Sequence, residues 1–112
     1  MLWRNQVIAA AFAAVFLVSD TPISQAEQLN AGAILNNMSA VERFTYLSGV
    51  IEGLAHARFV ADGGATGRAC LHAWFYDTPE SRRKLEAAFA RYPNEYAAPI
   101  ILALTKRQCG GS

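Results

Sequence analysis

The sequence contains few of the residue patterns that predict catalysis or cofactor binding. Its 112 residues include only two cysteines and two histidines, and no third ligand has the spacing of a metal site. Ser39 and Ser48 lie outside any nucleophile-elbow context. The glycines of residues 62–67 lack the lysine and the spacing of a phosphate-binding loop. These absences predict a protein that is not an enzyme and that needs no cofactor, with a small exported enzyme as the weaker alternative.

An excess of charge of either sign is also lacking. Ten Lys and Arg residues face nine Asp and Glu residues, so the net charge is +1. Proteins that bind nucleic acids or membrane surfaces usually need a clear basic excess, and the sequence argues against both partners. Repeats, low-complexity tracts and long linkers are absent as well. The chain is therefore expected to hold one small domain.

Only one long hydrophobic run is present, from Val7 to Val18, and it follows Arg4. A polar stretch then ends in Ser24-Gln25-Ala26, the small-residue spacing that signal peptidase accepts. We expect residues 1–26 to be a signal peptide cleaved between Ala26 and Glu27, which leaves a domain at residues 27–112. As a helix the run would rise only about 18 Å, too short for a stable membrane anchor.

Cys70 and Cys109 both belong to the part that remains after cleavage. In a short exported chain, two cysteines most simply form one disulfide bond, rather than a reactive thiol pair or metal ligands. The bond would close a loop over residues 71–108. Loop-entropy arithmetic assigns it at most about 4 kcal/mol of stabilisation, a large share of a small domain's stability.

The rest of the chain predicts helices and no strand. Ser39 and Glu42 have the spacing of a capping box and precede a helix over about 40–61, which Asp62-Gly63-Gly64 ends. A weak helix over 29–36 precedes it. Further helices are expected over 79–91, where Thr78 can cap and Pro79 suits the first turn, and over 96–108. Residues 69–76 favour either a short helix or an irregular packed turn. The fold class is thus all-α, a small bundle of four to five helices with one disulfide.

Several polar and aromatic residues admit both a functional and a structural interpretation. Glu52 and His56 can meet on one helix face, more simply as a surface pair than as half of a metal or acid–base site. His72 is expected to be packed and hydrogen-bonded, although either histidine could act as a pH switch. Residues 82–84 (Arg-Arg-Lys) favour a solvated face in which Glu86 offsets Arg82, over a grip on an acidic partner. Residues 74–76 (Trp-Phe-Tyr) favour core packing over an exposed anchor.

One pattern resembles a known family. Residues 46–54 (YLSGVIEGL), Cys70-Leu71, a helix containing Pro99 and the terminal Cys109 are similar to the Tai-like immunity proteins of type VI secretion. The resemblance covers about residues 44–110, and it departs from the family pattern at His72, where proline often follows the Cys-Leu pair. It implies an HdeA-like helical fold in the periplasm and a partner that is a secreted cell-wall amidase.

The main functional expectation is therefore a periplasmic protein that binds another protein and has no chemistry of its own. An HdeA-like acid-stress chaperone is the alternative, with the carboxylates and histidines supplying its charge change. Because exposed loops often carry recognition, the partner-binding residues are expected at Asp62, Gly63, Gly64 and Thr66. The sequence leaves both a monomer and a homodimer open.

Overall fold

The computed structural model describes residues 29–111, and these form five α-helices with no strand among them. The expected leader, residues 1–26, and its cleavage site between Ala26 and Glu27 lie outside the described residues. The helices are α2 (Ala31–Asn37), α3 (Ala40–Asp62), α4 (Thr66–Asp77), α5 (Pro79–Arg91) and α6 (Ala97–Cys109). The predicted all-α class with one disulfide is thus confirmed. Residues 69–76, for which two conformations were open, belong to the α-helix α4.

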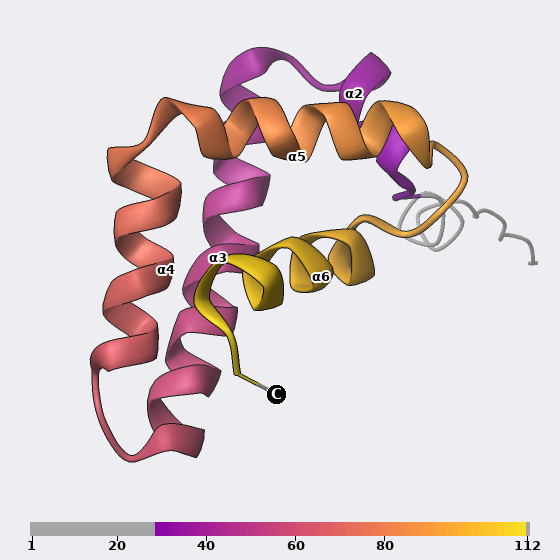
Figure 1. Ribbon diagram of the computed structural model, residues 1–112. Helices are drawn as coiled ribbons and strands as arrows, with labels where there is room; N and C mark the ends of the chain where they lie inside the picture. The colour runs from indigo at the N-terminus through magenta and orange to yellow at the C-terminus, as the bar shows by residue number, and fades with distance from the viewer. Residues whose placement is uncertain (1–28, 112) are drawn as a thin grey trace, which may run out of the picture.

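The antiparallel pair α3 and α4, together with a crossing helix, organises the molecule (Figure 1). α3 and α4 run side by side in opposite directions, and α5 crosses their upper end in this view. α6 returns beneath α5 and ends close to the α3–α4 pair. One hydrophobic cluster joins these helices, and its largest fully buried members are Phe75, Phe89, Ile34, Leu47, Ile51, Leu85 and Ile101. Every helix therefore contributes apolar side chains to the same core.

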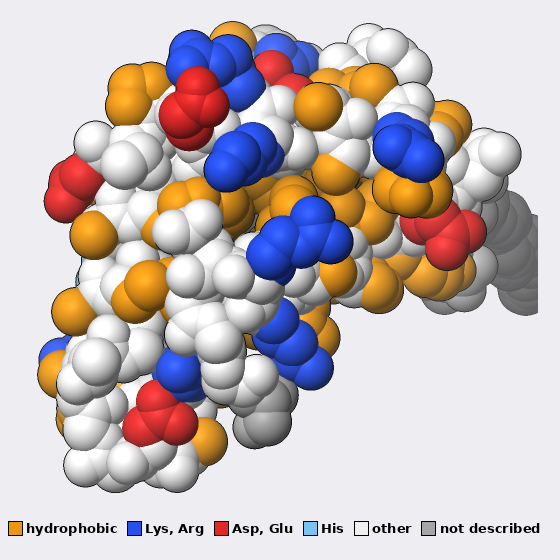
Figure 2. All heavy atoms as spheres, in the orientation of Figure 1, with side chains coloured by type: hydrophobic (Ala, Val, Ile, Leu, Met, Phe, Trp, Pro, Cys, Tyr) orange, Lys and Arg blue, Asp and Glu red, His pale blue; other side chains and the backbone are white. Residues whose placement is uncertain are grey.

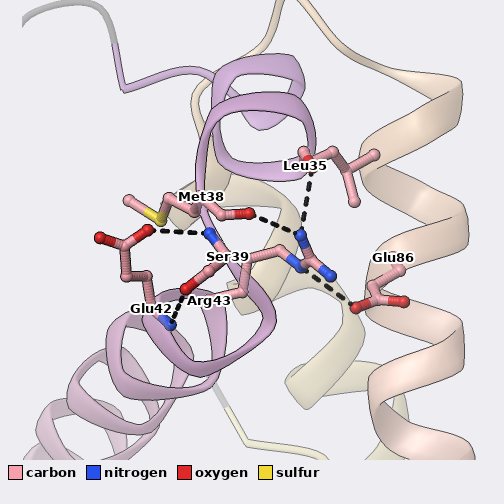
Figure 3. Close-up of polar contacts among 6 residues, drawn as sticks. All are labelled: Leu35, Met38, Ser39, Glu42, Arg43 and Glu86. Carbon is pink, nitrogen blue, oxygen red and sulfur yellow. Dashed lines mark hydrogen bonds and ion pairs between the residues drawn. The ribbon is translucent and has the colours of Figure 1, made fainter.

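The start of α3 is fixed by side-chain hydrogen bonds, as its sequence predicts (Figure 3). The Glu42 amide donates to Ser39 Oγ at 3.1 Å, and the Ser39 amide donates to Glu42 Oε1 at 2.8 Å, which completes the capping box. Arg43 then donates to the carbonyl oxygens of Leu35 and Met38, at 3.2 and 2.8 Å. Its Nε lies 3.4 Å from Glu86 Oε2 on α5. One arginine thus ties the α2–α3 turn to α5 (Figure 3).

Two glycines are required by the backbone. Gly63 ends α3 with a left-handed φ of 66° and donates its amide to the Phe59 carbonyl, so a residue without Cβ suits this position. Gly32 lies against the α5–α6 loop, where its amide donates to the Pro93 carbonyl at 2.8 Å. A Cβ added at Gly32 would stand 3.0 Å from Pro93 Cβ. This close approach holds α2 against the turn between α5 and α6.

Two details differ from the expectations. Thr78 precedes α5 but makes no capping bond; its hydroxyl donates to the Trp74 carbonyl of α4 instead. Glu86 does not offset Arg82, because it pairs with Arg43 across the helix interface. In both cases the partner differs from the local one that the spacing indicates. Thr78 bonds to the end of the preceding helix, and Glu86 pairs with a residue of another helix.

Candidate functional site

The expected recognition loop is shorter than its sequence suggests. α3 extends to Asp62 and α4 begins at Thr66, so only residues 63–65 connect the two helices. Asp62 accepts a 2.6 Å hydrogen bond from Arg58 Nε one turn earlier. Asp62, Gly63 and Thr66 are exposed and Gly64 is half-buried, so these residues are accessible, although the Asp62 carboxylate already has a partner. The assignment of partner binding to this segment stays a prediction.

Arg58 explains why Asp62 has this structural role. Besides Asp62, the guanidinium donates to the backbone carbonyls of Gly110 and Cys109, at 2.9 and 3.2 Å. A cation at these carbonyls satisfies acceptors that the end of α6 leaves unpaired, and it opposes the negative end of the helix dipole. The Asp62–Arg58 pair therefore anchors α6 to α3, in addition to the disulfide next to it.

The predicted disulfide between Cys70 and Cys109 is confirmed. It joins the first half of α4 to the last residue of α6, and the two Cα atoms lie 5.9 Å apart. α6 is thus held at its C-terminal end by a covalent bond to α4 and by Arg58 of α3. The bond is structural, and it fixes the position of α6 relative to the α3–α4 pair.

Glu52 does not pair with His56, contrary to expectation, because its side chain reaches across to α4. Glu52 Oε2 accepts a 2.8 Å hydrogen bond from the Tyr76 hydroxyl, and Oε1 lies 3.1 Å from His72 Nε2. The bond from Tyr76, followed by that from His72, lowers the pKa of the Glu52 carboxyl. Partial burial and then the bond to Glu52 raise the pKa of Tyr76. One carboxylate thus bridges α3 and α4, and His72 is hydrogen-bonded as predicted.

Next to this bridge lies a partly exposed group that we call the aromatic surface: Phe44, His72, Tyr76 and Arg82. Phe44 stacks on the buried Phe75 with ring centroids 5.8 Å apart, and the edge of Tyr76 meets both rings. The Arg82 guanidinium lies 4.9 Å from the Phe44 ring centroid, a cation–π contact. Phe44 and Tyr76 remain 37% and 42% exposed. Three helices therefore hold two aromatic rings and a cation in fixed positions at the surface.

The sequence predicts parts of this surface but not their assembly. Residues 74–76 are expected in the core and Arg82 in a solvated run. Trp74 and Phe75 are indeed buried, whereas Tyr76 points outward. The exposed Val41, one turn before Phe44, extends the apolar area. Tyr76 following two buried aromatic residues was the one available signal, since a third ring in succession cannot share their helix face.

These groups can bind, but within residues 29–111 they do not assemble a metal-ligand cluster of three or more His, Cys, Asp or Glu side chains. No helix in the same part of the chain is long and apolar enough to cross a membrane. Comparison of the chain with protein-family models, with curated proteins and with solved structures finds no match. The site must therefore be interpreted from its own geometry.

Proposed function

We propose that this chain is an exported binding protein that uses the aromatic surface to hold another protein, and that it has no catalytic chemistry of its own. The observation that carries this proposal is the exposure of Phe44 and Tyr76 beside Arg82 on a rigid helical support. Tyrosine and arginine are enriched among the residues that dominate binding energy at protein interfaces. The resemblance of residues 44–110 to type VI immunity proteins favours a secreted cell-wall amidase as the partner.

The packing of the surface supports this role. Phe44 and Tyr76 are already held by Phe75, and Glu52 fixes the Tyr76 hydroxyl from α3. Side chains that are ordered before binding lose little conformational entropy when the complex forms, so more of the contact energy appears as affinity. Because the Tyr76 hydroxyl and His72 are already engaged by Glu52, few free polar groups remain to orient a small molecule, and the surface suits a complementary protein face better.

Two further observations support export to the periplasm. The apolar run of residues 7–18 and the small residues before Glu27 have the pattern of a cleaved leader. The Cys70–Cys109 bond is of the kind that persists in oxidising compartments and is rare in the cytosol. Both fit a protein that meets its partner outside the cytoplasm.

The proposal is tested with any secreted cell-wall hydrolase that is encoded next to the gene for this chain. The protein, purified from the periplasm of an expression host, is added in increasing amounts to that hydrolase acting on peptidoglycan. We expect saturable inhibition at equimolar protein. A hydrolase that retains full activity at excess protein, or a gene neighbourhood with no secreted hydrolase, would overturn the proposal.

The Glu52 bridge favours one alternative function, an acid-stress chaperone. Protonation of Glu52 removes the charge that His72 and Tyr76 now stabilise, and the α3–α4 pair loses one of its ties. Apolar helix faces would then become available to unfolding clients. Light scattering of a client protein near pH 2–3 distinguishes this function: suppressed aggregation supports it, and undiminished aggregation excludes it.

A further inference from the structure

A second binding feature lies on α5 and α6, separate from the aromatic surface and sharing no residue with it. A groove of about 610 Å³ opens between these helices. Its walls are mostly apolar, and they are formed by Ala87, Ala88, Tyr92, Pro99, Ile100, Ala103 and Leu104. Figure 2 shows this hollow as hydrophobic side chains below the level of the surrounding surface, between α5 and α6.

The groove continues toward α4. A second hollow of about 320 Å³ shares Ala87, Leu104 and Arg107 with the first, and Trp74 and Gln108 line its far side. The α5 wall runs from Lys84 to Tyr92, a length of about 12 Å at the helical rise. The opposite wall on α6 has a similar length. Together they match about two turns of a helix laid between them.

The rim of the groove is basic. Lys84, Arg91 and Arg107 line it, against the single carboxylate of Glu95. Within residues 29–111, the ion pairs involve Arg43, Arg58, His72 and Arg83, and no carboxylate lies within 4.0 Å of these three cations. Lys84 contributes, after Arg83, to lowering the pKa of the Glu80 carboxyl, and the Arg91 guanidinium lies 5.6 Å from the Tyr92 ring centroid, so Arg107 is the least engaged of the three. In Figure 2, Lys and Arg side chains border the hydrophobic hollow. An apolar floor with three cations and one carboxylate at its edge complements an occupant that is apolar on one face and acidic at its margins.

The helical backbone of the groove walls favours a helical occupant over an extended peptide. α5 and α6 use their amides and carbonyls within the helices, so the groove offers side chains and almost no backbone partners. An extended peptide would leave its own amides unpaired there, whereas a helix satisfies them internally. The groove is also open along its length, and a small ligand would stay largely in water, unlike the ligands of enclosed pockets.

From this geometry we infer that the α5–α6 groove binds an acidic amphipathic helix of a partner protein. Apolar residues at positions i, i+3, i+4 and i+7 of that helix lie on the groove floor, and its flanking Asp or Glu residues pair with Lys84, Arg91 and Arg107. This goes beyond the proposed function, because it assigns a second surface with a different chemistry of recognition.

The test uses a fluorescein-labelled helical peptide of roughly 15 residues, with leucines at the four anchor positions and glutamates beside them. A second peptide has lysines in place of the glutamates. Fluorescence anisotropy with the full-length protein should show binding of the acidic peptide at least about tenfold tighter than that of the basic one, with affinity falling as salt rises. A labelled long-chain fatty acid serves as the third probe.

Matched variants locate the site. Arg107→Glu lies on the groove rim, whereas Lys106→Glu makes the same charge change one residue away, where the side chain lines the hollow between α3 and α6. We expect Arg107→Glu to lower the affinity for the acidic peptide about tenfold, and Lys106→Glu to change that affinity little. Ala103→Glu places a carboxylate on the exposed apolar wall and should also lower the affinity for the acidic peptide. Circular dichroism checks the fold of each variant. Equal binding of both peptides, equal losses in the two charge variants, or saturable binding of the fatty acid alone would overturn the inference.

Discussion

The aromatic surface and the α5–α6 groove differ in how far their side chains are already paired. On the aromatic surface, Phe44 is stacked by Phe75 and Arg82, and Tyr76 is hydrogen-bonded to Glu52. In the groove, Arg91 and Arg107 have no carboxylate within 4.0 Å among the described residues, and the apolar walls face solvent. The side chains of the first surface are therefore held by contacts within the fold, whereas the rim of the groove has one cation–π contact, from Arg91 to Tyr92, and no ion pair among the described residues.

This difference separates residues that contribute to both stability and binding from residues that contribute mainly to one of them. If the aromatic surface binds the partner as proposed, its residues contribute to both, because removing one of them also removes a contact within the fold. On the rim of the groove, Arg91 and Arg107 form no ion pair within the described residues and contribute to the fold mainly as cations in the last turns of α5 and α6. Substitutions on the aromatic surface should therefore lower stability and affinity together, and substitutions on the rim should lower affinity with little change in stability.

The largest expected effect comes from the disulfide, which holds α6 and hence one wall of the groove. Replacing Cys70 and Cys109 by serine should lower the free energy of unfolding by at most about 4 kcal/mol, measured by urea denaturation. Because α6 contributes nothing to the aromatic surface, the serine variant should lose more affinity for the acidic peptide than for the amidase when both are measured without urea. Equal losses would mean that the two surfaces are not separately supported.

A smaller loss is expected for Phe44→Ala. Phe44 is partly exposed, yet it stacks on Phe75, so truncation should lower the free energy of unfolding by about 1–2 kcal/mol. Val41→Ala, one turn earlier and 75% exposed, is the matched control and should cost less than about 0.5 kcal/mol. Arg107→Gln on the rim of the groove should lower the free energy of unfolding by a similarly small amount. If Phe44→Ala proved as mild as Val41→Ala, the aromatic surface would not be ordered by the fold.

The capping box at the start of α3 should contribute about 1 kcal/mol. Ser39→Ala removes the oxygen that accepts from the Glu42 amide, and chemical denaturation should show the loss. Thr66→Ala is the matched comparison, because Thr66 is exposed in the first turn of α4, a helix without a side-chain capping bond. Equal losses in the two variants would show that the cap at Ser39 does not stabilise the helix that carries Phe44.

The smallest effect is the pH dependence contributed by Glu52. Its pKa is lowered in the folded state, so its contribution to stability is present above the unfolded pKa of about 4.3. That contribution is lost as the pH falls through the lowered folded value. Glu52→Gln should therefore be less stable than the wild type at pH 7, and the difference should shrink at pH 3. Denaturation curves at the two pH values measure it, and a constant difference would contradict the assignment.

Local patterns in the sequence predict most of the secondary structure. The capping box, the glycines after Asp62 and Pro79 locate the starts and ends of α3 and α5 to within a residue of the structure. These signals succeed because capping and chain reversal depend on neighbours a few residues apart. The disulfide was predictable for a different reason, since the chain offers only one possible pair of cysteines.

Contacts between helices could not be predicted in the same way. Glu52 was matched with His56 because they lie four residues apart, whereas its partners His72 and Tyr76 are 20 and 24 residues away. Helical periodicity gives the face on which a residue lies but not the register of the facing helix. The groove was missed for the same reason: its basic rim and apolar walls meet only once α5 and α6 are placed against each other.

The most direct test of the account is a calorimetric titration of the proposed partner, a secreted cell-wall amidase encoded next to this gene, with three forms of the protein. These are the wild type, Phe44→Ala/Tyr76→Ala and Asp62→Asn/Thr66→Ala. If the aromatic surface is the binding site, Phe44→Ala/Tyr76→Ala alone should lose about 2 kcal/mol or more of binding free energy, roughly thirtyfold in affinity. Unchanged affinity in Phe44→Ala/Tyr76→Ala, together with a large loss of affinity in Asp62→Asn/Thr66→Ala, would place the binding site at the α3–α4 loop and contradict the account.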